Sequence, residues 1–205
     1  MKYLKMLGLA AVAALALAAF GAGTASATQL CSTNTSPCTG TVYGKGTVIK
    51  AQLKAGTIAN LTTSTGNVTC STSSVEGKTS NAGGAGVPVT GEITSLKFSN
   101  CTMDVFGSPS CTVTSVGIPT SVEANATGGG NGTMTTGEAG ATVVCAGFIN
   151  CTFTAPGIEL GVTGGNPAHV TANAEKLTGG GSLCPSEAKW DATYEVTAPK
   201  PLFLV

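Results

Sequence analysis

The sequence contains no arginine, only one histidine (His169) and only one tryptophan (Trp190). Charged residues make up 10% of the chain, and ten lysines balance ten acidic residues. Surfaces that bind nucleic acid rely on clustered basic residues, above all arginine, because its planar guanidinium donates two hydrogen bonds to one phosphate. The lysines form no cluster. We therefore predict no nucleic-acid partner and no attraction to an anionic membrane surface.

The residue sets that carry catalysis are scarce as well. A serine–histidine–acid triad would have to use His169, but the chain has no Gly-x-Ser-x-Gly motif to supply its nucleophile. The only aspartates are Asp104 and Asp191. Asp104 is most simply a residue of a hairpin loop, and Asp191 a charge on the polar face of a strand. The glutamates are scattered singly along the chain. Neither a calcium-loop pattern nor a phosphate-binding glycine motif occurs. The sequence predicts that the protein is not an enzyme and binds no cofactor.

Metal chemistry is disfavoured by the spacing of the cysteines. Zinc ligands usually come in cysteine pairs two to four residues apart, whereas no two cysteines here are closer than Cys145 and Cys151. A Cys-x-x-Cys redox pair is also absent. We therefore predict no metal site and interpret the cysteines as structural.

The first residues of the chain have the features of an export signal. Lys2 and Lys5 precede an apolar run over 6–20, and small residues at 25–27 follow it. This pattern predicts a signal peptide over residues 1–27 that is cleaved before Thr28. A retained membrane anchor is the alternative, but the run is shorter than the roughly 20 residues that a spanning helix needs. No later segment is long and apolar enough to span a membrane, so we predict a secreted, extracellular protein, free or associated with the cell envelope.

The rest of the chain is rich in threonine, valine and glycine, and its hydropathy alternates with a period of two. In the clearest run, polar residues alternate with five apolar residues that share one face of a strand. These five are Ala188, Trp190, Ala192, Tyr194 and Val196. Such alternation is typical of half-buried strands. Weaker runs cover 151–155, 158–163 and 168–175. A run over 87–98 changes phase near Thr94, which predicts a β-bulge.

Glycine-rich segments separate these runs and predict turns, whereas no helical periodicity occurs after residue 27. Short strands with regular turn signals are typical of antiparallel sandwiches and barrels. We predict an all-β fold, an antiparallel β-sandwich (or flattened barrel) of roughly 10–12 short strands stapled by disulfides. Residues 28–45 are predicted to form an N-terminal extension with a small disulfide loop, and residues 46–205 a single β domain.

Eight cysteines follow the signal peptide, an even number that predicts a disulfide framework. Cys31 and Cys38 are near neighbours and are expected to close the small N-terminal loop. Two further pairs flank turn sequences and predict hairpin bonds, Cys101–Cys111 and Cys145–Cys151. Elimination then leaves a long-range bond, Cys70–Cys184.

Several segments resemble a known group of proteins. They are GNVTCST at 66–72, ITSLKFSNCT at 93–102, CTVT at 111–114, SLCP at 182–185 and WDATYEVT at 190–197. The pattern is similar to that of small secreted Thr/Gly-rich β proteins of actinobacteria, a group that carries no assigned activity. The resemblance covers about residues 46–205, and Cys31 and Cys38 lie outside it. It implies a secreted β domain and nothing about chemistry.

Two functions are compatible with these patterns. The favoured one is a non-catalytic secreted or cell-envelope β-sandwich with a structural or interaction role, since the chain combines a disulfide framework with no catalytic set. The alternative is an extracellular binding module for a small apolar molecule or a glycan. In that case Trp190 and Tyr194, with Phe98 and Phe153, would line a pocket between sheets, although such aromatics are more often ordinary core residues.

Overall fold

The computed structural model describes residues 27–107, 109–147, 149–181 and 184–205. Apart from Ala27, the predicted signal peptide lies outside the described residues. Strands and the turns between them make up the described chain, which contains no helix, so the all-β prediction is confirmed.

The strands of the N-terminal half are β1 (Ala27–Thr28), β2 (Leu30–Cys31), β3 (Val48–Leu53), β4 (Ala59–Thr63), β5 (Gly66–Thr79), β6 (Gly84–Ala85), β7 (Val89–Met103) and β8 (Ser110–Val116). Those of the C-terminal half are β9 (Thr120–Gly128), β10 (Asn131–Thr136), β11 (Ala139–Cys145), β12 (Ile149–Ala155), β13 (Glu159–Thr163), β14 (His169–Gly180), β15 (Glu187–Ala198) and β16 (Phe203–Leu204). Twelve of them form one antiparallel sheet.

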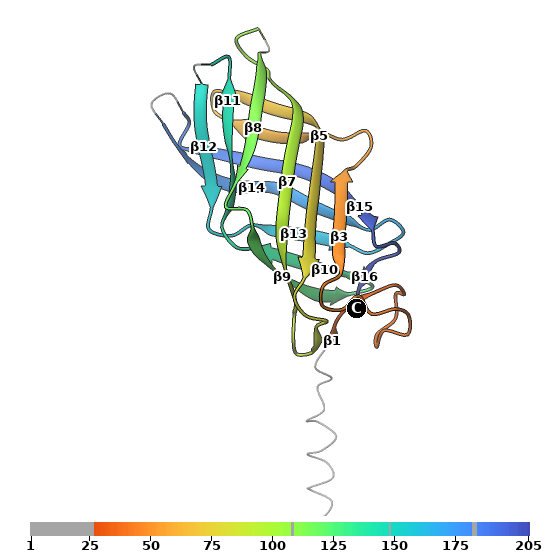
Figure 1. The fold of residues 1–205 in the computed structure, drawn as a ribbon. Helices are drawn as coiled ribbons and strands as arrows, with labels where there is room; N and C mark the ends of the chain where they lie inside the picture. The colour runs from red at the N-terminus through yellow and green to blue at the C-terminus, as the bar shows by residue number, and fades with distance from the viewer. Residues whose placement is uncertain (1–26, 108, 148, 182–183) are drawn as a thin grey trace, which may run out of the picture.

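This sheet closes on itself. The pairings run in a ring through β7, β5, β3, β15, β14, β13, β10 and β9, and β9 pairs again with β7, which makes an eight-stranded antiparallel barrel. The extra strands β4, β8 and β12 pair with the far halves of the long strands β5, β7, β14 and β15, and β11 joins β8 to β12, which closes a second ring. In Figure 1 β8, β11 and β12 lie toward one end of the molecule, and β9, β10 and β16 toward the other.

The predicted sandwich is therefore wrong, and the barrel given as its alternative describes the fold. The reason is that bulges bend the long strands, so each pairs with different neighbours along its length. Between β5 and β7 the register shifts where Glu76 opposes Ser95 but Gly77 opposes Ile93, which leaves Thr94 as the extra residue, as the change of phase predicted. Another shift, in β14 after Ala172, separates its pairings with β13 and β12.

The alternation read from the sequence matches the burial of most strands. In β15 the predicted inward face is buried or half-buried throughout, with Val196 only 2% exposed. The run over 168–175 holds only as far as Ala172. Ala174, predicted on the inner face, is exposed and has a φ of 53°, because the bulge in β14 lies there.

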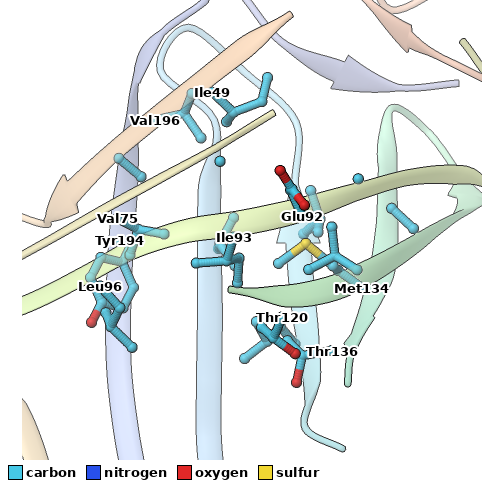
Figure 2. Close-up of a pocket in the computed structure, with 18 of the residues that line it drawn as sticks. Ile49, Val75, Glu92, Ile93, Leu96, Thr120, Met134, Thr136, Tyr194 and Val196 are labelled. Carbon is cyan, nitrogen blue, oxygen red and sulfur yellow. The ribbon is translucent and has the colours of Figure 1, made fainter. Parts of the chain in front are cut away.

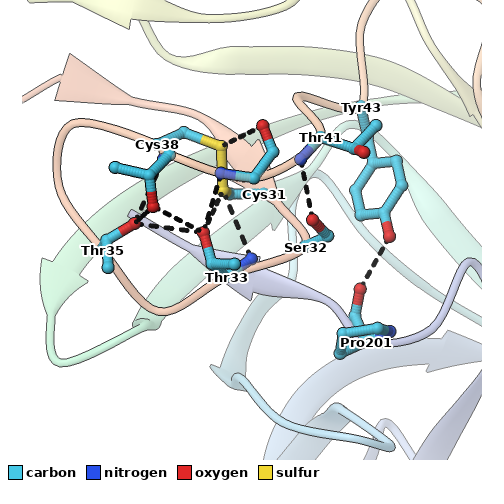
Figure 3. The surroundings of a disulfide bond; sticks show 10 residues. Cys31, Ser32, Thr33, Thr35, Cys38, Thr41, Tyr43 and Pro201 are labelled. Carbon is cyan, nitrogen blue, oxygen red and sulfur yellow. Dashed lines mark hydrogen bonds between the residues drawn. A yellow bond between two sulfur atoms is a disulfide. The ribbon is translucent and has the colours of Figure 1, made fainter.

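The N-terminal extension packs against the end of the chain at one end of the barrel. Strand β2 pairs with β16, and Leu30 lies in a core cluster with Leu202 and Leu204. Figure 3 shows the adjoining disulfide loop, in which threonine hydroxyls hydrogen-bond to one another and the Tyr43 hydroxyl donates to the Pro201 carbonyl at 2.8 Å. These contacts close this end of the barrel.

Four disulfides are present, and only Cys31–Cys38 was predicted correctly. The other predicted bonds are wrong: the two hairpin bonds Cys101–Cys111 and Cys145–Cys151, and the long-range bond Cys70–Cys184. The observed bonds are Cys70–Cys101, Cys111–Cys145 and Cys151–Cys184.

The strand register explains this error. Cys70, Cys101, Cys111 and Cys145 form one row across β5, β7, β8 and β11, so Cys101 opposes Cys111 and also Cys70. The bonded neighbours have Cα atoms only 4.0 and 4.2 Å apart, near the short spacing of the non-hydrogen-bonded pairs of an antiparallel sheet. Across the next hairpin Cys145 opposes Ile149, so it does not face Cys151. The spacing of the cysteines along the chain identifies which strands form a hairpin. It does not identify which other strand pairs with the outer edge of that hairpin.

Candidate ligand-binding cavity

An apolar cavity of about 170 Å³ lies inside the eight-stranded barrel and is called the main cavity below. Every strand of the ring contributes to its wall, for example Ile49 of β3, Val75 of β5, Met134 of β10 and Val196 of β15 (Figure 2). The alternation of each strand turns these side chains inward, because successive residues of a strand point to opposite faces. The cavity is therefore a product of ring closure.

Trp190 and Tyr194, the two residues predicted to bind a ligand, both line the main cavity from β15. Their ring centroids are 6.4 Å apart, with the planes tilted by 58°. The other aromatics of that prediction are placed elsewhere: Phe98 and Phe153 line two further spaces along the barrel. The structure thus brings Trp190 and Tyr194 together at one wall.

The hydroxyl of Tyr194 is buried and lies 2.9 Å from the hydroxyl of Ser73. Burial raises the pKa of Tyr194 to about 12, and the hydrogen bond with Ser73 offsets part of that rise. The neutral phenol is thus the form that the folded protein holds.

The raised pKa of Tyr194 predicts a loss of stability in alkali. A tyrosine in the unfolded chain releases its proton near pH 10, whereas the folded protein keeps it up to about pH 12. The stabilisation is fully present below pH 10 and is lost as the pH rises through 12, by roughly 2–3 kcal/mol in free energy of unfolding. Urea unfolding of the wild type and of Tyr194→Phe between pH 9 and about 12 measures it. Equal slopes for the two proteins would contradict it.

Other polar groups around the main cavity are already hydrogen-bonded within the protein. The Thr136 hydroxyl donates to the Gly137 carbonyl at 2.8 Å, and the Thr79 hydroxyl donates to the Gly44 carbonyl at 2.5 Å. The charged ends of Lys78 and Glu92 pair at 3.0 Å, with 56% and 37% of their side chains exposed. The cavity therefore offers shape and apolar contact to a ligand, and no charge.

Most of the wall was not predicted as a site. Ile93 and Leu96 lie in the run over 87–98, whose alternation marks an inner face, but nothing in that run tells a cavity wall from a filled core. Met134 and Val75 lie in strands with weaker patterns. Identifying them needs the closed ring, which joins strands far apart in the sequence.

His169, Asp104 and Asp191, which were weighed as catalytic candidates, lie outside the main cavity. His169 is half-buried in β14, opposite Glu195. Asp104 accepts hydrogen bonds from the backbone and side-chain nitrogens of Asn67, both at 2.7 Å, and Asp191 accepts one from the Ala174 backbone N–H at 2.7 Å. In the part of the chain that the structure describes, no cluster of histidine, cysteine and acidic residues has the arrangement of a metal site.

No described helix has the length and hydropathy needed to cross a membrane. Comparison with family models, with curated proteins and with solved structures gave no match for this chain. The resemblance to secreted actinobacterial β proteins therefore stays a prediction from the sequence.

Proposed function

We propose that this protein binds a small, uncharged, apolar molecule in the main cavity. The observation that carries the proposal is an apolar space of about 170 Å³ lined by all eight strands of a closed barrel. An engineered cavity of about 150 Å³ in another protein binds benzene, so this space suits a molecule of one or two rings.

The cost of an empty cavity supports the same proposal. At about 24 cal/mol per Å³, an unfilled space of this size costs about 4 kcal/mol. A domain is typically stable by only about 5–15 kcal/mol, so this cost is a large fraction of the total. A ligand that restores the missing contacts would recover much of it, since dispersion and apolar burial need no polar partner.

The disulfides bear on where this binding would take place. Four disulfides are typical of proteins that reside in oxidising environments, such as the cell exterior. We infer a secreted or envelope-associated protein that holds an apolar molecule away from water.

Titration with toluene tests the proposal. We expect toluene to raise the midpoint of thermal unfolding and to shift the emission of Trp190, because that indole lines the cavity. Ala172→Leu places extra atoms in the main cavity from β14 and should abolish both responses. Thr171→Leu, on the neighbouring position of the same strand and outside the cavity wall, is the matched control and should keep them.

Failure of toluene and of a panel of similar compact apolar compounds to change either signal would contradict a cavity-binding function. The role expected first from the sequence, a non-catalytic structural or interaction protein, would then be the better proposal. Equal responses of Ala172→Leu and Thr171→Leu would show that the binding occurs elsewhere on the molecule.

A further inference from the structure

The main cavity does not stand alone. A space of about 60 Å³, the middle cavity, lies beside it, and a space of about 190 Å³, the end cavity, lies beyond. Main and middle cavities share the wall residues Leu96, Ala139, Ile158 and Trp190. Middle and end cavities share Leu61, Val68 and Val143. The three spaces therefore form a row along the inside of the barrel, in which neighbouring cavities share part of their walls.

Most of the wall of the row is apolar. No charged residue lines the middle or the end cavity. The walls of these two cavities come from the second ring, through inward residues of β4, β5, β11 and β12, together with the disulfide cysteines Cys145 and Cys151. The middle cavity also includes Asn60, whose Oδ1 is buried without a hydrogen-bond partner among the described residues, so a hydrocarbon would meet one polar atom in an otherwise apolar wall.

The two ends of the row differ. At the main cavity, Leu30 and Leu204 line the wall as buried side chains, with Leu204 fully inaccessible to solvent. At the end cavity the wall includes Phe106, which is 71% exposed, and the hydroxyl-bearing residues Thr63 and Thr65. The exposed apolar ring of Phe106 and the neighbouring hydroxyl groups mark the end cavity as the entrance to the row.

We propose that the row binds one unbranched hydrocarbon chain, that of an uncharged amphiphile such as a long-chain alcohol. The chain enters past Phe106 and extends to the main cavity, and its polar end stays near Thr63 and Thr65. This inference rests on the proposed function and specifies its ligand. A series of small spaces in line suits an extended chain better than a compact ring system. Together the three volumes reach the range of about 300–1,000 Å³ that is usual for ligand sites.

Binding of primary alcohols of increasing length tests the proposal on the intact secreted domain. Each further methylene that is buried should tighten binding about fourfold, the equivalent of about 0.8 kcal/mol. We expect calorimetric titration to show this gain from octanol through decanol to dodecanol, followed by a plateau once the row is filled. Toluene, measured beside them, reports on the main cavity alone.

A variant tests the route between the cavities. Ala139 lines the wall shared by the main and middle cavities, so Ala139→Leu should remove the gain in affinity from octanol to dodecanol. Thr142→Leu on the same strand, outside all three cavity walls, should bind like the wild type. If Ala139→Leu does not fold, the length series on the wild type still decides.

The outcomes separate the two proposals. Toluene binding with no gain from octanol to dodecanol would overturn the chain-binding inference and keep the proposed function. A full length gain in Ala139→Leu would also overturn it, because the chain would then bypass the shared wall. Absence of binding by every probe would overturn both.

Discussion

Replacing Leu204 with alanine is expected to lower the free energy of unfolding by about 2–5 kcal/mol. Leu204 is fully buried and packs with Leu30 and Leu202 where β16 meets β2. Truncation removes apolar atoms that line the end of the main cavity, so the new void adds to the space already there. Urea unfolding monitored by Trp190 fluorescence measures the loss.

The control for Leu204→Ala is Val48→Ala. Val48 is 46% exposed at the start of β3, so its truncation should change stability by only about 0.5 kcal/mol or less. A similar small effect for Leu204→Ala would mean that β16 does not hold the end of the barrel shut. The m-value should stay unchanged in both variants if each still unfolds as a single unit.

Much of the fold follows from local patterns. The inward face of β15 and the bulge at Thr94 were predicted because alternation is a property of neighbouring residues, whatever the strand pairs with. Closure into a barrel was predicted only as the alternative to a sandwich, since closure depends on β9 returning to β7 and on β12 returning to β14. Periodicity within a strand does not encode those partners.

The candidate site divides in the same way. Trp190 and Tyr194 were predicted because they are rare aromatics in the strongest strand pattern of the chain. Their aliphatic neighbours Ile49 and Met134 belong to strands β3 and β10, which are distant in sequence and come together only in the closed ring. The residues that make the cavity are ordinary inward-facing ones, and only their mutual placement leaves a space.

The disulfide Cys111–Cys145, beside the end cavity, gives the other large expected effect. Replacing Cys111 and Cys145 together with alanine should cost about 3–4 kcal/mol in free energy of unfolding, because the bond closes a loop with a sequence separation of 34. Removing Cys31–Cys38, with a separation of 7, should cost only about 2 kcal/mol. The difference arises in the unfolded chain, where a longer cross-linked loop forbids more conformations.

Urea unfolding of the two double-alanine variants beside the wild type measures this order, and a peptide map under non-reducing conditions first verifies the pairing. Equal losses, or a larger loss at Cys31–Cys38, would contradict the loop-length argument. The Cys111–Cys145 bond also ties β8 to β11, and the Cys145 side chain lines the end cavity. Loss of that bond should therefore weaken binding of long-chain alcohols, whereas loss of Cys31–Cys38 should not. If removing Cys111–Cys145 lowers the stability without changing alcohol binding, the bond stabilises the fold but takes no part in the proposed entrance.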